Sequence, residues 1–351
     1  MPTKRYHPAS IFLHWLVFLL VIAAFITIEL KGQFPKGSEP RELCKQIHGV
    51  FGQLIFIAMA FSAMPSANSD SPDLPPLADG PLPKNLKPQI SLAKLDRAKA
   101  YVDRCHVQQN LTSTTAPCVY GDINSDTTIV LFGDSHALSW FPAIEKLAIA
   151  KDWKLVSLTM SSCWPADIPA YNPVKKIEMN NCEIWRKNAL HQIGDLQPDI
   201  TFIAGTRGFS TLNDLGDEAE GEERTQIWKA GMTSTLKTIV ASSIRTIYLG
   251  EYPVSTQDVP ACLQKNLSDY SKCATPLTKA IDSDWLLTEQ SVAKDNGAEF
   301  VDPSSWICKT NPCSPIDGKK LIYLDGGHLT ATFALTLEAP LWRTISSAPT
   351  N

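Results

Sequence analysis

Apolar residues are distributed unevenly along the chain. Residues 11–30 form a run of 20 whose only formal charge is Glu29, which is long enough to cross a bilayer as a helix. Residues 47–64 form a second run of 18 without a formal charge, and nothing after Pro65 is both long and apolar enough to span. The pattern predicts an apolar membrane helix or hairpin followed by a soluble body.

The soluble body is set apart from the apolar head by a proline-rich stretch. Residues 65–90 carry seven prolines mixed with Ser, Asp and Gly, and proline at that density stiffens and extends a chain. We therefore expect a membrane anchor over residues 1–64, a linker over residues 65–90 and one domain, large enough to hold an active site, over residues 91–351.

The body alternates β-rich apolar segments with helical stretches. The predicted strands are residues 128–132, 154–159, 199–204, 245–250 and 298–301. The predicted helices are residues 92–102, 137–150, 174–193, 222–242 and 276–296, with a last one after Thr330. Alternation at this spacing is typical of an α/β fold with a parallel sheet of about five strands between two helical layers. Ligands of such sheets bind at the carboxyl ends of the strands.

Composition narrows the compartment and the partners. The net charge is −4, which gives no basic footprint for nucleic acid. One of the nine cysteines, Cys44, precedes the linker, and the other eight follow one another in close pairs: Cys105/Cys118, Cys163/Cys182, Cys262/Cys273 and Cys308/Cys313. Such spacing suits four local disulfides in an oxidising space, although about 105 pairings are possible in principle. The rival interpretation is a metal site, but C-x-x-C pairs are absent, so we expect no metal.

Two polar stretches carry candidate chemistry. Gly133-Asp-Ser-His136 directly follows the first predicted strand, a place where a strand-to-helix turn presents a nucleophilic hydroxyl, here Ser135. Leu324-Asp-Gly-Gly-His-Leu329 offers His328 as the base and Asp325 as the carboxylate that orients it. We expect Asp134 and His136 to support the turn, and His106 and His191 to be solvated.

These stretches resemble the first and last motif blocks of the SGNH (GDSL-type) hydrolases. The resemblance is closest to the periplasmic SGNH domain at the C-terminus of acyltransferase 3 proteins, and covers about residues 85–345. Flanking motifs agree with it: Cys118-x-Tyr-Gly-Asp122, His136-Ala-x-x-Trp-Phe-Pro142, Ser162-Cys-Trp-Pro165 and Cys182-x-x-Trp-Arg186. The resemblance implies a flavodoxin-like three-layer fold and a catalytic triad of Ser135, Asp325 and His328.

The resemblance is incomplete at the oxyanion hole. Family members add a glycine N–H after the second strand and an asparagine side chain after the third. This chain instead has Ser161-Ser-Cys163 and Ala204-Gly-Thr-Arg-Gly208 at those places. We expect the backbone of Ser135 and Ser162, with Arg207 in place of the asparagine, to provide the donors.

The first 60 residues resemble the start of bacterial cytochrome b561. His14, in His-Trp-Leu, and His48, in His-Gly-x-x-Gly, match haem-ligand positions of that family. The family needs two further helices to bring the partner histidines, and none follows here at membrane depth. We therefore expect a truncated anchor and no haem, and leave a haem-binding electron-transfer protein as an alternative.

The orientation of the anchor stays open. Lys4 and Arg5 favour a cytoplasmic N-terminus, whereas the basic residues between the two apolar runs favour the opposite arrangement. Three solutions would place the body outside: a single span, an external N-terminus, or a second run that serves as an export signal with a cleavage site near Ala63 and Ala67.

Together these features predict a serine esterase or O-acyltransferase. It would act on acyl, in particular acetyl, esters of envelope polysaccharide, from the periplasmic face of a bacterial inner membrane. An acyl-donating membrane protein is an expected partner, and membrane lipid would contact the anchor. Hydrolysis and transfer both remain open, as does a non-catalytic glycan-binding scaffold.

Overall fold

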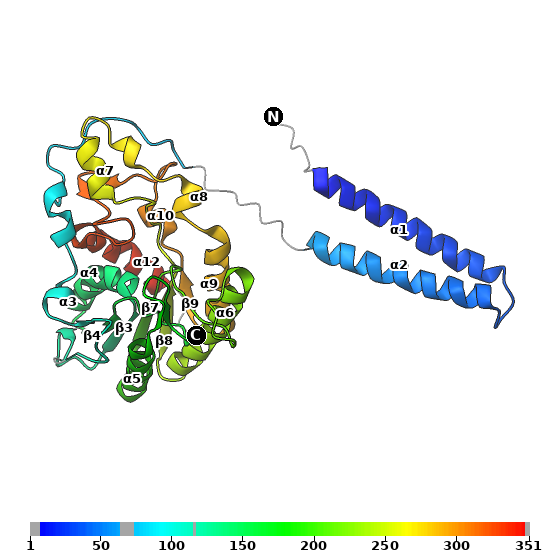
Figure 1. Cartoon of the computed structure of the whole chain (residues 1–351), viewed down its shortest axis with the longest axis horizontal. Coiled ribbons are helices and arrows are strands. Elements are labelled where there is room, and N and C mark those ends of the chain that lie inside the picture. Colours follow the sequence, from blue (N-terminus) through cyan, green and yellow to red (C-terminus); the bar gives the residue numbers. More distant parts are fainter. Residues whose placement is uncertain (1–7, 64–73, 115–116, 348–351) are drawn as a thin grey trace. The chain divides into compact units, whose positions relative to one another are not determined.

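The structure is a computed structural model that describes residues 8–63, 74–114 and 117–347. The chain separates into two compact units, Met1–Pro72 and Asp73–Asn351 (Figure 1). Residues 65–73 of the predicted linker and Met64 of the second apolar run lie outside the described residues.

The first unit is a pair of helices, α1 (Pro8–Gly32) and α2 (Glu39–Ala63), joined by a short turn. Within the described residues, one window, Trp15–Gly32 of α1, is long and apolar enough to cross a membrane. The first turns of α2 carry the charged residues Glu39, Arg41, Glu42 and Lys45. The structure therefore supports one membrane-length apolar helix and leaves the role of the second run a prediction.

The second unit is built on a seven-stranded sheet with the order β1-β4-β3-β7-β8-β9 and with β2 against β4. Five of its strands correspond to the predicted ones: β3 (Thr128–Gly133), β4 (Lys154–Met160), β7 (Ile200–Ala204), β8 (Arg245–Leu249) and β9 (Glu299–Val301). These five strands pair with one another in parallel, which confirms the predicted strands and sheet. The order reverses after β3, so the carboxyl ends of β3 and β7 flank the switch point where such folds bind ligands.

Two short strands at one edge were missed from the sequence. β1 (His106–Val107) pairs in parallel with the carboxyl end of β4, and β2 (Val119–Gly121) pairs antiparallel with its first half. Two or three residues are too few to show an alternating pattern. The structure places them by their partners on β4 and by the Cys105–Cys118 disulfide.

Helices cover both faces of the sheet (Figure 1). Along β3, Ile129 and Leu131 point to the face covered by α4 (Ser135–Ala150) and α12 (Glu338–Ser347). Val130 and Phe132 point to the face covered by α5 (Asn180–Leu196), α6 (Gly221–Val240) and α9 (Ser283–Asp295). Since every residue of β3 is buried, this strand forms the centre of the core.

Three helix predictions were wrong in extent. The helix predicted over residues 174–193 begins only at Asn180. The residues before it form the hairpin of β5 (Tyr171–Asn172) and β6 (Ile177–Glu178), in which Lys176 has a left-handed backbone with φ 53°. The predicted helix 276–296 is divided into α8 (Leu277–Ala280) and α9, since Asp282 caps a new helix by accepting from Trp285 N. The predicted helix 92–102 is likewise two pieces, η1 (Ile90–Leu95) and α3 (Lys99–Val102).

Short elements complete the second unit. They are α7 (Val259–Lys265), η2 (Tyr270–Cys273), α10 (Ser304–Ile307), β10 (Ile316–Asp317), β11 (Lys320–Leu321), α11 (Ala331–Ala334) and η3 (Leu335–Leu337). Residues 74–90, which we expected to belong to the spacer, bond to this unit: Leu82 N donates to Leu267 O and Lys87 N to Lys319 O.

Candidate active site

The candidate nucleophile stands at the turn between β3 and α4. Gly133 has φ 145°, and a Cβ there would lie 1.9 Å from Ala204 O on the neighbouring strand. Only glycine fits so close an approach. Ser135 is the first residue of α4, so its backbone N–H is one of the donors that a helix leaves unpaired at its start.

Asp134 fastens this turn. Its Oδ1 accepts from His136 N at 2.7 Å and Ala137 N at 3.3 Å, and its Oδ2 accepts from Thr206 N at 2.9 Å. The carboxyl is fully buried, and burial raises its pKa to about 6 against the opposing effect of these three N–H donors. Asp134 thus ties the end of β3 to the loop after β7, which matches the structural role expected for it.

The candidate base lies on a tight turn around Gly326 and Gly327. Asp325 Oδ1 accepts from Gly327 N at 2.7 Å and His328 N at 2.8 Å, while Leu324 N donates to His328 O. Burial would raise the pKa of Asp325, but the bonds from His328 and from the two backbone N–H groups outweigh it and lower that pKa to about 2. The carboxylate therefore stays ionised at neutral pH.

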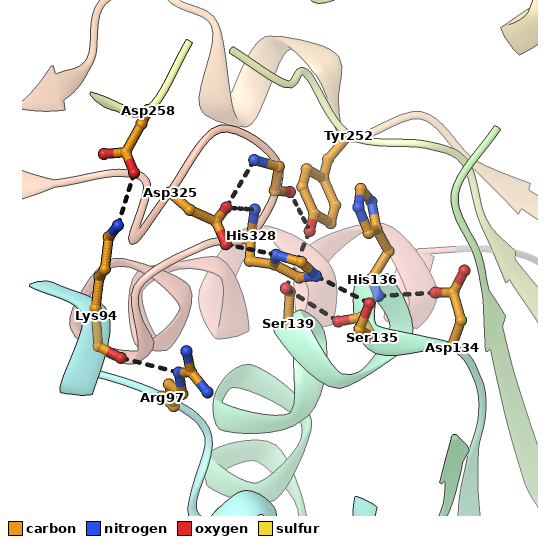
Figure 2. Close-up of polar contacts among 11 residues, drawn as sticks. Lys94, Arg97, Asp134, Ser135, His136, Ser139, Tyr252, Asp258, Asp325 and His328 are labelled. Atoms are coloured by element: carbon orange, nitrogen blue, oxygen red, sulfur yellow. Dashed lines mark hydrogen bonds and ion pairs between the residues drawn. The ribbon is translucent and has the colours of Figure 1, made fainter. Parts of the chain in front are cut away.

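The structure brings Ser135, His328 and Asp325 into one chain of hydrogen bonds (Figure 2). His328 Nε2 lies 2.9 Å from Ser135 Oγ, and His328 Nδ1 lies 2.9 Å from Asp325 Oδ2. A serine, a histidine and a carboxylate in this order have the geometry of a nucleophile, a base and an orienting group.

Two further side chains hold the histidine turn against α4. Tyr252, in the loop after β8, donates to Gly327 O at 2.9 Å, and its Oη lies within hydrogen-bond distance of Ser139 Oγ at 3.0 Å (Figure 2). His136 stacks on the Tyr252 ring at 4.9 Å between centroids, and a Cβ on Gly327 would lie 3.5 Å from His136 Nε2. Burial lowers the pKa of His136 to about 3, so it stays neutral beneath the turn. Sequence reasoning missed Tyr252 and Ser139, since neither belongs to a recognisable motif.

Ser135 and His328 open into a cavity of about 290 Å³. The cavity is also lined by Asp325, Ser161 and Ser162, and on another side by Arg97, Tyr101, His106 and Gln108. The prediction that His106 is solvated was wrong: it is 3% exposed, and its Nδ1 lies 3.1 Å from Thr159 Oγ1. The signal that was overlooked is its position next to Cys105, whose disulfide fixes the edge of the sheet. His191 is exposed, as expected, and contacts Asp195.

The predicted oxyanion donors separate into two groups. Ser162 lines the cavity with Ser135, and its backbone is held in the left-handed region with φ 54°. Arg207 does not line this cavity. Its Nη1 pairs with Glu251 Oε2 at 3.2 Å and its N donates to Glu251 Oε1 at 2.9 Å, because the buried Glu251 carboxylate needs charge compensation. We therefore do not retain Arg207 as an oxyanion donor.

All four predicted disulfides are present, namely Cys105–Cys118, Cys163–Cys182, Cys262–Cys273 and Cys308–Cys313. Cys44, in α2, is free. Across residues 8–63, 74–114 and 117–347, His, Cys, Asp and Glu form no group of three or more suited to a metal ion.

His48 of α2 contacts α1: its Nδ1 lies 3.0 Å from Ala24 O and 3.5 Å from Thr27 Oγ1. The side chain of His14 lies outside the part of the chain that the structure describes, so the expected absence of haem stays a prediction.

Known proteins resemble both parts of the chain. The family described as "SGNH domain (fused to AT3 domains)" matches residues 104–343. The periplasmic domain of a lipopolysaccharide acetyltransferase from Salmonella ser. Paratyphi A has 19% sequence identity and a TM-score of 0.49, over 64% of this chain and 86% of that one. An acetylxylan esterase from Geobacillus stearothermophilus has 14% identity and a TM-score of 0.37, over 65% of this chain and 97% of that one.

The N-terminal residues match a different protein. Cytochrome b561 homolog 1 of Escherichia coli (strain K12) is 34% identical over 56 residues, which are 16% of this chain and 32% of that protein. The chain thus spans about a third of this relative's length.

Proposed function

The chain belongs to the family of SGNH domains fused to AT3 domains, and is an enzyme acting on ester bonds; we propose that it does so through an acyl-enzyme formed on Ser135. The observation that carries the proposal is the hydrogen-bonded series Ser135 Oγ, His328 Nε2, His328 Nδ1 and Asp325 Oδ2 at one wall of a cavity.

The proposed reaction begins when Ser135 Oγ attacks the acyl carbonyl carbon and His328 Nε2 takes the hydroxyl proton. Asp325 holds His328 Nδ1–H and stabilises the imidazolium that forms. The tetrahedral intermediate then expels the sugar oxygen, which takes the proton back from His328, and Ser135 is left acylated. Water or a second sugar hydroxyl releases the acyl group by the reverse sequence, with His328 again as the base.

The oxyanion of the tetrahedral intermediate requires donors near Ser135. We assign the backbone N–H groups of Ser135 and Ser162, the first at the N-terminus of the 16-residue helix α4 and the second in a residue that lines the same cavity. The unusual left-handed backbone at Ser162 supports this assignment, because strained residues are retained where a site depends on them.

We further propose that the substrate is an acylated, in particular acetylated, envelope polysaccharide and that the enzyme works in the periplasm. Four disulfides in the second unit support an oxidising compartment, and the apolar window Trp15–Gly32 supports a membrane anchor. A separate membrane protein would supply acyl groups if the enzyme transfers rather than hydrolyses.

Two activity measurements test the catalytic proposal. A fluorophosphonate probe should label the wild-type chain but not Ser135→Ala, and p-nitrophenyl acetate should be hydrolysed only by the former. Ser234→Ala, a change at an exposed serine of α6, is the matched control and should label like wild type. Absence of labelling in a correctly folded wild type would leave a glycan-binding scaffold as the better interpretation.

The free thiol of Cys44 tests the orientation of the anchor. A membrane-impermeant maleimide applied to spheroplasts should label Cys44 if only α1 spans, and should not if both helices span. Protease should degrade the second unit in either case. Protection of the second unit from protease would contradict the periplasmic location.

A further inference from the structure

The cavity has a second wall that the catalytic steps do not use. It consists of Arg97, Tyr101, His106 and Gln108, which all line the cavity and come from one segment before the nucleophile strand. We call these four residues the β1 wall, because they lie on and around strand β1 (His106–Val107). The triad comes from the N-terminus of α4 and from the turn after β11, so the two walls are independent in sequence.

Polar groups of the β1 wall are left without partners. Arg97 Nε donates to Lys94 O at 2.9 Å (Figure 2). Its guanidinium lies 5.4 Å from the Tyr101 ring centre. Among the described residues, none bonds to the two terminal guanidinium nitrogens or to Tyr101 Oη. A half-buried phenol and an exposed guanidinium that face a cavity can therefore exchange water for a ligand at little cost.

The other two residues contribute an acceptor and a buried ring. Gln108 Nε2 donates to His106 O at 3.2 Å, and no bond to its Oε1 is formed among the described residues. His106 packs edge-on against Tyr101 at 4.9 Å between ring centres, and its Nε2 has no partner among the described residues. Because burial keeps His106 neutral, with its pKa lowered to about 3, the ring supports the wall without adding charge.

The β1 wall is fixed in place on both sides. The Cys105–Cys118 disulfide and the pairing of His106 with Thr159 join it to β4. On the other side, Asp96 accepts from Ala331 N and Thr332 N, just beyond the histidine turn. Such anchoring holds the wall at a constant separation from the triad, as a binding site that positions a substrate requires.

We propose that the β1 wall is the subsite for the sugar unit that carries the ester. A sugar presents adjacent hydroxyls that both donate and accept, and the wall offers donors on Arg97, an acceptor on Gln108 and both on Tyr101. The cavity volume of about 290 Å³ is at the small end for ligand sites, which suits an acetyl group and one ring rather than a long acyl chain.

This inference rests on the proposed esterase function, so the test compares two substrate classes in one enzyme. Mono-O-acetyl methyl glucosides, galactosides and rhamnosides carry a sugar, and p-nitrophenyl acetate does not. The measured quantity is the ratio of kcat/KM for the best sugar acetate to kcat/KM for p-nitrophenyl acetate. Arg97→Gln and Tyr101→Phe should each lower this ratio about tenfold, mainly through KM for the sugar acetate, since each removes one hydrogen bond to the sugar.

Lys151→Gln is the matched control, because Lys151 also lies over an aromatic ring, that of Trp342 at 3.9 Å, but does not line the cavity. It should leave the ratio unchanged. The inference is overturned if Arg97→Gln and Tyr101→Phe lower kcat/KM for both substrate classes by the same factor, or if neither variant changes the ratio. It is also overturned if the wild type has no higher kcat/KM for any sugar acetate than for p-nitrophenyl acetate. Loss of all hydrolysis and of probe labelling in wild type would instead refute the proposed function.

Discussion

Asp325→Asn separates the catalytic role of this carboxylate from its structural role. Asp325 Oδ1 accepts from Gly327 N and His328 N, and an asparagine Oδ1 can keep both bonds. The asparagine NH₂ would then face His328 Nδ1 in place of Oδ2, 2.9 Å away in the wild type. A donor in that position forces the imidazole proton onto Nε2, so His328 meets Ser135 Oγ with a proton and cannot accept one.

The expected loss is large in rate and small in stability. Fixing the wrong tautomer in a triad lowers kcat by about 10⁴, which corresponds to about 5.5 kcal/mol in the barrier. The pKa of Asp325 is lowered to about 2 from 3.8, equivalent to at most about 2.4 kcal/mol of folding free energy. Because about a third of the carboxylate is exposed, solvent screening reduces this to about 1–2 kcal/mol.

The assay is steady-state hydrolysis of p-nitrophenyl acetate together with denaturant unfolding between pH 2 and 7. The lowered pKa means that the carboxylate stabilises the fold above about pH 4 and loses this effect as pH falls through 2. The stability difference between wild type and Asp325→Asn should therefore shrink in acid, whereas Asp325→Ala, which also loses the two backbone bonds, should remain less stable than Asp325→Asn. If Asp325→Asn keeps kcat within tenfold of wild type, Asp325 does not orient His328 and the triad assignment fails.

Three further outcomes are expected. Tyr252→Phe removes the bonds to Gly327 O and Ser139 Oγ, and should cost about 1–2 kcal/mol in urea unfolding and lower kcat several-fold, since the histidine turn loosens; unchanged kcat and stability would contradict a supporting role. The raised pKa of Asp134 means that the folded state holds its proton more tightly than the unfolded chain, so stability should fall by about 2 kcal/mol as pH rises from about 4 to 6. Asp134→Asn should not show the fall in stability that the Asp134 carboxyl causes as pH rises. Identical pH–stability curves for the variant and the wild type would refute this prediction. The same variant places an NH₂ against Thr206 N, so its absolute stability at pH 4 should be lower than that of wild type, as measured by thermal unfolding.

The parts of the fold that were predictable are those with a long, regular pattern. The strand ending at Gly133 has six consecutive buried residues, and its boundary is marked by a glycine that no other residue could replace. The Asp-x-x-His turn was predictable for a similar reason, because the spacing alone lets one carboxylate bond both the backbone and the imidazole. Short edge strands lack such a pattern: β1 has two residues, and its place depends on β4 and on a disulfide.

The same contrast explains which site residues the sequence could reveal. Arg207 follows the third long strand, where related enzymes place an oxyanion donor, so sequence position favoured it. The structure shows a competing partner, the buried Glu251, which also accepts from Thr206 Oγ1 and is itself close to a second buried carboxyl, Glu289. Arg207 is held there by the Glu251 carboxylate, and no local sequence pattern indicates a carboxylate that lies 44 residues away.

Without Arg207, the site has one fewer oxyanion donor than we expected from the sequence, and this bears on the reaction that it favours. An acyl-enzyme is formed and broken through the same oxyanion, so a weaker hole slows acylation and deacylation alike and does not by itself favour water over sugar as the acceptor. The choice of acceptor then depends on how well a sugar hydroxyl is held near His328 once Ser135 is acylated. The β1 wall is the part of the cavity suited to hold this hydroxyl. Polar groups of Arg97, Tyr101 and Gln108 have no partner among the described residues, and the backbone of the wall is anchored to β4 and to the segment after His328. Variants of Arg97 and Tyr101 should therefore change the ratio of transfer to hydrolysis, whereas Asp325→Asn should lower both reactions equally.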